Sequence, residues 1–276
     1  MSTRNADQIE YWNGAAGRTW VDVQARIDRL LAPISAALID RADPQPGERA
    51  VDVGCGCGDT TIAVAQRGAA VWGIDISEPM LARARSRATG LDNLAFSRAD
   101  AATQHFTPDH QLVLSRFGVM FFDDPVAAFA NLRTALTAEG RLVFSAWQAP
   151  ALNPWVALAA RAAQPFLPPP EAEADPRAPG PFAFADADYV RELLGAAGFR
   201  DIVLEPFSTD LHVADDVDGA MEFLTAIGPM ARVLKELDEA TAARAIAAVR
   251  DALAPLATAD GVALGSACWL VEARPR

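Results

Sequence analysis

Residues 51–60 (VDVGCGCGDT) constrain this chain more than any other stretch of its sequence. The apolar start is typical of a buried strand, and glycines then follow at every second position. Glycine permits a left-handed backbone and lets a ligand approach the main chain closely. A helix beginning near Asp59 would direct its free N–H groups toward that ligand. The segment therefore predicts a nucleotide-type loop between a strand and a helix.

The spacing of this loop and the acids that follow it narrow the choice of ligand. Dinucleotide loops have the pattern G-x-G-x-x-G and hold a pyrophosphate, whereas this loop has G-x-G-x-G. Asp59 would repel a diphosphate but not a zwitterionic sulfonium compound. Asp75 ends an apolar segment and lies 21 residues after Gly54, a spacing that suits a carboxylate accepting ribose hydroxyls. Asp100 follows the apolar segment 94–97 and can accept an adenine amine.

These motifs resemble those of class I S-adenosylmethionine (SAM)-dependent methyltransferases, most closely the ubiquinone/menaquinone-biosynthesis-like branch. The resemblance covers residues 45–150 through five ordered motifs at 51–60, 73–81, 99–101, 112–122 and 140–144. It implies a Rossmann-like, doubly wound α/β sheet of seven strands, the last one antiparallel, with helical lid insertions. It also implies SAM as cofactor and methyl transfer by in-line displacement to O, C or N of a small apolar or aromatic molecule.

The cofactor residues implied by the resemblance lie mainly at the ends of the predicted strands. Asp52 would orient the amino group of the cofactor, directly or through water, Asp75 would hold the ribose, and Asp100 would hold the adenine. Helix capping is the alternative role for Asp52 and Asp100, and a solvated loop acid is the alternative for Asp75. The full predicted set is Asp52, Gly54, Gly56, Gly58, Asp75, Ile76, Met80, Asp100, Ala101, Arg116 and Trp20.

Two residues are candidates for catalysis. Arg116 ends the predicted fourth strand, where it would bind an acidic group of the substrate or form a surface ion pair. His212 lies at the entrance to a helical insertion near the expected acceptor pocket, and an ordinary surface histidine is the alternative. Asp124 followed by Pro125 is typical of a helix N-terminus.

The N-terminal aromatic residues and the cysteines allow competing interpretations. Tyr11, Trp12 and Trp20 lie close together and would either face the sulfonium through cation–π attraction or pack in the core. Cys55 and Cys57 lack a second cluster that could complete a zinc site, so we expect them to be small turn residues. The resemblance places no acidic metal ligands after the fourth and fifth strands, and no metal is expected.

The pattern of apolar segments divides the chain into six parts. These are an N-terminal helical cap (1–44), a SAM-binding core (45–149), a proline-rich insertion (150–185), a core helix and strand (186–212), a helical substrate lid (213–258) and a final strand (259–276). Helices are expected at 60–67, 78–89, 125–137, 153–163 and 186–197, with two helical segments in 7–42. A break at Gly228-Pro229 would separate two lid helices.

Composition limits the class of protein. Of 276 residues, 51% are apolar, which suffices for a large core, and the net charge is −12. This acidity disfavours binding to nucleic acid through its phosphates. No segment suggests a membrane span or a signal peptide. We therefore expect a cytoplasmic bacterial protein acting on a small molecule, and the sequence is compatible with a homodimer.

Two other functions stay open at this point. An NAD-dependent oxidoreductase would share the fold, although the loop spacing and Asp59 count against it. A SAM-binding module without catalysis would keep the cofactor motifs and act through a partner. The sequence identifies neither the acceptor nor a general base.

Overall fold

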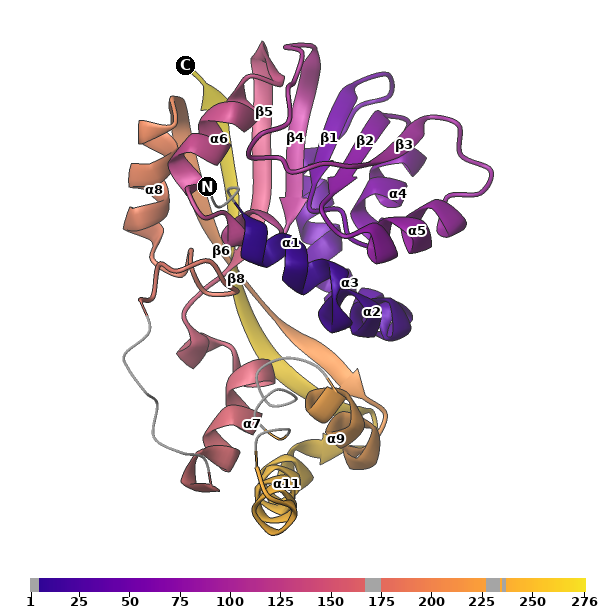
Figure 1. The fold of residues 1–276 in the computed structure, drawn as a ribbon, viewed down its shortest axis with the longest axis vertical. Coiled ribbons are helices and arrows are strands. Elements are labelled where there is room, and N and C mark those ends of the chain that lie inside the picture. Colours follow the sequence, from indigo (N-terminus) through magenta and orange to yellow (C-terminus); the bar gives the residue numbers. More distant parts are fainter. Residues whose placement is uncertain (1–4, 167–174, 227–233, 235–236) are drawn as a thin grey trace.

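The computed structural model describes residues 5–166, 175–226, 234 and 237–276. Its centre is a twisted sheet with the strand order β3-β2-β1-β4-β5-β8-β6 (Figure 1). The strands are β1 (Arg49–Val53), β2 (Ala70–Asp75), β3 (Leu94–Arg98), β4 (His110–Arg116), β5 (Leu136–Trp147), β6 (Phe199–Ala214) and β8 (Gly261–Pro275), and the short β7 (Ala257–Thr258) pairs with β8. Strands β1–β5 are parallel, and β8 is antiparallel to β5 and β6. The predicted fold class is confirmed.

Helices cover both faces of the sheet, so the central strands are buried on both sides. On one face, α3 (Gln24–Ala42) packs against α4 (Asp59–Gln66), and on the other α6 (Pro125–Arg133) packs against α8 (Ala187–Ala196). The helix α5 (Glu78–Arg87) packs on β3. Val51, Leu112 and Leu114 have no exposed surface. Burial of these apolar strands fixes the carboxyl ends of β1–β5 along one edge of the sheet.

Several predicted boundaries differ from the structure. The N-terminal region forms three helices instead of two. Gly14 separates α1 (Ala6–Asn13) from α2 (Ala15–Asp22), and α3 follows. The helix predicted over 125–137 ends at Arg133. Beyond it, the carbonyl of Ala135 accepts a hydrogen bond from His110 N–H, and this pairing draws the chain into β5.

The two longest strands extend beyond the rest of the sheet. The predicted core helix and strand end at residue 212, but β6 stays paired with β8 from Phe199↔Pro275 to Ala214↔Val262. The far end of this hairpin carries α9 (Val217–Ala226) and α11 (Glu239–Leu253), beside α7 (Pro154–Ala163) (Figure 1). We call α7, α9 and α11 the lid helices. The predicted break at Gly228-Pro229 lies outside the described residues, as does part of the proline-rich insertion.

In the described part of the chain, none of the helices combines the length and apolar character needed to cross a bilayer. Figure 1 shows α1 lying across the carboxyl ends of the central strands, with the lid helices on the same side. Ligands of doubly wound sheets bind beyond these strand ends. The functional site is therefore expected between the strand ends, α1 and the lid helices.

Candidate active site

A cavity of about 590 Å³ lies at the carboxyl ends of β1–β5. Its walls come from the loop after each of these strands, from the N-terminal helices, from α7 and from residues 179–182. A volume of this size is typical of a small-molecule site. The predicted site residues that line it are Trp20, Gly54, Gly56, Asp75, Ile76, Met80, Asp100, Ala101 and Arg116. Asp52, Gly58 and His212 are not among the lining residues.

The glycine loop is held against the end of β4 and against Asp75. Gly54 has a φ of +65°, and a side chain there would lie 2.9 Å from the Cα of Gly118. The amide of Gly56 donates to Oδ2 of Asp75 at 2.8 Å. The loop that follows β1 therefore lies between the ends of β2 and β4, the two strands that flank β1, and its backbone is open to the cavity.

Asp75 ends β2, and two backbone amides hold its carboxylate in place at the cavity. Its Oδ1 accepts a second hydrogen bond from the amide of Ser77 at 2.8 Å. Burial raises the pKa of this carboxyl above its usual range, while the two amides favour the charged form. Since a carboxylate has about four acceptor positions, Asp75 retains two for hydroxyl groups of a ligand.

Asp100 is already bound by a residue that the sequence did not indicate. The side-chain amide of Asn5 donates to Oδ1 and Oδ2 of Asp100, at 2.9 Å and 3.0 Å. Asn5 also exchanges two hydrogen bonds with Asp123, from its own N–H and to its Oδ1. Asn5 thus ties the N-terminus to the loops after β3 and β4. No local pattern predicts a contact between residues 95 positions apart.

Asp52 is not among the residues that line the cavity, so it could act on a ligand there only indirectly. It has no exposed surface, and its Oδ2 accepts hydrogen bonds from the hydroxyls of Thr60 and Thr61, both at 2.6 Å. These residues form the first turn of α4, so Asp52 fixes the start of the helix from behind the loop. Its Oδ1 has no partner among the described residues. The bonds from Thr60 and Thr61 join side chains, and α4 has no side-chain cap at its start, so the role of Asp52 toward the amino group of the cofactor stays a prediction.

The burial of Asp52 should make stability depend on pH. Burial raises the pKa of Asp52 from 3.8 to about 6, although the two threonine hydroxyls oppose the shift. Unfolding then releases a proton between these pH values, so this group makes the free energy of unfolding fall as pH rises. Urea unfolding at pH 5 and pH 7 should show that the wild type loses about 1 kcal/mol more than Asp52→Asn. An equal change in both proteins would contradict this expectation.

Gly58 is also directed away from the cavity. It precedes α4 with a φ of +83°, and a side chain there would lie 2.9 Å from Cζ of Phe96 and 3.0 Å from Cβ of Ala84. The glycine is therefore required by the left-handed turn and by packing of α4 on its neighbours, not by contact with a ligand.

Arg116 and Asp59 form an ion pair in the wall of the cavity. Nη1 of Arg116 lies 2.6 Å from Oδ2 of Asp59 and donates to the hydroxyl of Ser35 at 2.6 Å. Arg87 lies 3.7 Å from the other oxygen of Asp59. An acidic substrate group would therefore compete with Asp59 for Arg116. The repulsion of a diphosphate by Asp59 is also weaker than the sequence suggested, because Arg116 offsets the charge of Asp59, whereas Arg87 pairs more closely with Asp28 at 2.7 Å.

His212 lies outside the cavity, so its predicted position near the acceptor is wrong. Its side chain is 52% exposed, and Nε2 contacts Oδ1 of Asp215 at 2.9 Å. The reason is the length of β6, which continues through His212 to Ala214 and carries the ring past the strand ends. The alternative of a surface histidine fits this position.

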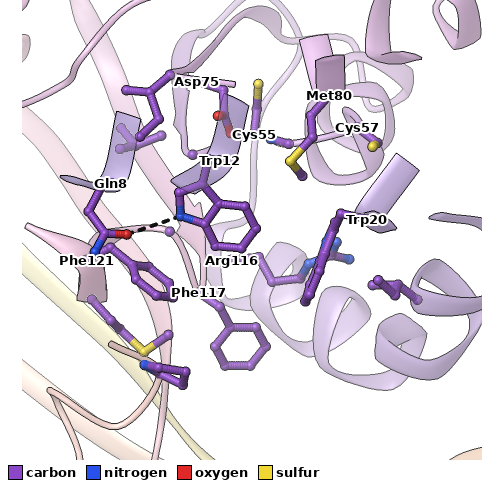
Figure 2. A pocket seen from close by; sticks show the side chains of 18 of the residues that line it. Gln8, Trp12, Trp20, Cys55, Cys57, Asp75, Met80, Arg116, Phe117 and Phe121 are labelled. Atoms are coloured by element: carbon purple, nitrogen blue, oxygen red, sulfur yellow. Dashed lines mark hydrogen bonds between the residues drawn. The ribbon is translucent and has the colours of Figure 1, made fainter. Parts of the chain in front are cut away.

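Aromatic rings form the other side of the cavity. Figure 2 shows Trp12, Trp20, Phe117 and Phe121 gathered below Asp75 and Met80. Trp12 makes edge contacts with Trp20 and Phe121, with ring centroids 5.6 Å and 5.8 Å apart. The N-terminal aromatic residues therefore face the cavity while packing on one another, so the two interpretations of this segment are not exclusive.

A second aromatic group lies near the lid. Phe117 stacks on Trp147 at 3.9 Å, and Trp147 contacts Trp155 of α7 at 5.1 Å. All three residues line the cavity. The sequence placed Phe117 at a strand end but gave Trp147 and Trp155 no role in binding. Their positions depend on the fold of α7 against β8, which no local motif signals.

The two cysteines of the loop also line the cavity as free thiols. Burial raises the pKa of Cys57 to about 12 and raises the pKa of Cys55 well above its usual range. Both are therefore protonated and unreactive at neutral pH. Across the described ranges, no group of three or more His, Cys, Asp or Glu side chains is arranged to hold a metal ion.

Known proteins share this core. Residues 50–140 match the family described as "Methyltransferase domain". Aklanonic acid methyltransferase DauC of a Streptomyces species is 35% identical over 128 residues, which are 43% of this chain and 58% of that protein. A 23S rRNA (uracil-C5)-methyltransferase of Chromobacterium violaceum is 36% identical over 113 residues, which are 38% of this chain and 22% of that enzyme. The matches thus span well under two thirds of these relatives.

The fold has counterparts among solved structures. The YcgJ protein of Bacillus subtilis superposes with a TM-score of 0.58 at 16% identity, covering 88% of this chain and 97% of the other. This likeness concerns the fold alone, whereas the family match includes the glycine loop and the three predicted acids Asp52, Asp75 and Asp100. Residues 50–140 of this chain therefore match a methyltransferase domain, and the activity of the whole protein is a proposal.

Proposed function

We propose that this protein transfers the methyl group of SAM to a small, flat, apolar or aromatic molecule. The observation that carries the proposal is one cavity with two unlike sides. In Figure 2 the loop cysteines and Asp75 lie on one side, and the rings of Trp12, Trp20, Phe117 and Phe121 lie on the other; Asp100 also lines the cavity. A cofactor bound to the first side would present its reactive group toward the second.

The residues of the first side fit the chemistry of SAM. Asp75 can accept the two ribose hydroxyls, and Asp100 can accept the adenine amine beside Asn5. Ile76 and Met80 offer apolar surface for the adenine ring. Gly54 and Gly56 leave the backbone open where a side chain would fill the space. When bound, SAM supplies an activated methyl group on a sulfonium.

The residues of the second side would hold and orient the acceptor. In-line displacement depends chiefly on the relative position of the reacting atoms. The rings of Trp12, Phe117 and Phe121 present faces and edges that suit an aromatic acceptor and also attract a nearby cation. The lid helices would exclude water from this side. His212 has no place in this arrangement.

Other observations favour a small acceptor over nucleic acid. One relative is named for a small acid and another for ribosomal RNA. The net charge of −12 disfavours an RNA partner because phosphate binding requires a basic surface. The atom methylated, the link to the quinone-biosynthesis branch, the cytoplasmic location and the homodimer stay predictions.

Calorimetric titration with SAM, S-adenosylhomocysteine and NAD tests the cofactor. We expect binding of the first two and no binding of NAD. Transfer of labelled methyl groups to phenols, quinols, aromatic acids and ribosomal RNA then tests the acceptor class. Labelling of RNA alone would overturn the small-molecule proposal. Binding of SAM without transfer to any acceptor would favour a non-catalytic module, and binding of NAD alone would favour an oxidoreductase.

A further inference from the structure

Phe117 has an unusual backbone for its residue type. Its φ is +61°, in the left-handed region that bulky side chains rarely adopt. The other non-glycine residues with positive φ in the described chain are Asn5, Asp43 and Asp201, whose side chains tolerate this conformation. Such strain persists only where the surrounding structure imposes it, and it is concentrated at functional sites.

Several contacts impose this conformation on Phe117. Its N–H donates to the carbonyl of Ser145 on β5 at 3.2 Å. The hydroxyl of Ser115 donates to the carbonyl of Val53 at 2.7 Å and accepts from the amide of Gly118 at 3.1 Å. The turn after β4 is thus bound to the end of β1, directly beside the glycine loop.

The turn after β4 places the Phe117 ring flat against the ring of Trp147, which supports it from one side. The ring is nearly parallel to that of Trp147, at an interplanar angle of 8° and a centroid distance of 3.9 Å. Trp147 is only 5% exposed, whereas Phe117 is partly exposed. Because Phe117 lines the cavity, its uncovered part faces the space between the glycine loop and the lid.

We propose that Phe117 determines acceptor specificity by stacking against a flat, conjugated ring system. This inference rests on the proposed function and narrows its acceptor class. A side chain held this firmly loses little freedom when a ligand binds, so the contact is preorganised. An aromatic pair contributes enough to change Kd about two- to tenfold beyond the burial of area. Saturated rings of the same size would lack this gain.

A matched pair of ligands tests the proposal directly. 2-Naphthol and decahydro-2-naphthol share a carbon skeleton and a hydroxyl, but only the first is flat and aromatic. Calorimetry would measure their Kd values for the wild type saturated with S-adenosylhomocysteine, and for Phe117→Leu and Phe117→Tyr. We expect the wild type to bind 2-naphthol about two- to tenfold more tightly than its saturated analogue. Phe117→Leu should lower this preference, and Phe117→Tyr should retain it.

Controls separate this inference from folding and from the proposed function. Phe166 lies outside the lining residues, so Phe166→Leu should leave the preference unchanged. The Kd of S-adenosylhomocysteine should be the same for Phe117→Leu as for the wild type, which also shows that the variant is folded. Equal binding of 2-naphthol and decahydro-2-naphthol by the wild type, or no binding of either, would overturn the role of Phe117. Failure of the wild type to bind S-adenosylhomocysteine would instead contradict the proposed function.

Discussion

Replacing Asp75 with alanine is expected to weaken SAM binding about 100-fold or more. SAM would lose the two hydrogen bonds that its ribose donates to the carboxylate. Hydrogen bonds to a charged group contribute about 1.5–3 kcal/mol each. The amides of Gly56 and Ser77 would also lose the acceptor that now holds them. Calorimetric titration gives the Kd values, and methyl transfer should fall in parallel where SAM is below its Kd.

Two control variants, Asp75→Asn and Asp92→Ala, show whether the loss of binding comes from the carboxylate of Asp75. The asparagine keeps one acceptor oxygen and the shape of the side chain, so its Kd should lie between those of the wild type and the alanine variant. Asp92 is exposed and outside the cavity, and its replacement should leave SAM binding unchanged. An unaltered Kd for Asp75→Ala would show that the ribose is held elsewhere and that the proposed cofactor position is wrong.

Replacing Gly118 with alanine should destabilise the protein and impair SAM binding together. The added Cβ would lie 2.7 Å from the carbonyl oxygen of Val53 and 3.0 Å from Cα of Gly54. Those atoms belong to the backbone, so the overpacking is expected to cost about 1–3 kcal/mol. Since Gly54 must shift to relieve it, the glycine loop would move as well. Urea unfolding and calorimetry measure the two effects.

Gly195→Ala is the matched control for this substitution. Gly195 lies inside α8, and no heavy atom is within 4 Å of the position that its Cβ would take. Because glycine is unfavourable within a helix, this variant should be more stable than the wild type by about 0.5–1 kcal/mol. A loss of stability in both variants alike would mean that steric contact with Gly54 is not the cause.

The sequence predicts the sheet, and it places many of the candidate cofactor residues in the cavity wall, because both depend on local patterns. Apolar segments define the parallel strands, and acids at strand ends such as Asp75 and Asp100 necessarily lie along one edge. The complete burial of Asp52 was not predicted, because the direction of its side chain depends on the hydroxyls of Thr60 and Thr61, which no strand pattern reveals.

The remaining features depend on contacts between distant segments. Asn5 reaches Asp100 only after the N-terminal helices fold over the strand ends. The left-handed backbone of Phe117 contradicts the preference of its residue type, so sequence reasoning disfavours it. His212 was misplaced because strand propensity gave no sign that β6 continues to Ala214.

The extended hairpin of β6 and β8 has a consequence for how such enzymes diversify. Two of the three lid helices, α9 and α11, lie within a single connection between its strands. A change in that connection reaches the acceptor side without interrupting the glycine loop or the acids that follow β2 and β3. The connection between β6 and β8 can therefore vary independently of the cofactor side. We expect related proteins to differ in this connection as a whole and to accept different acceptors, while the residues of the cofactor side stay the same.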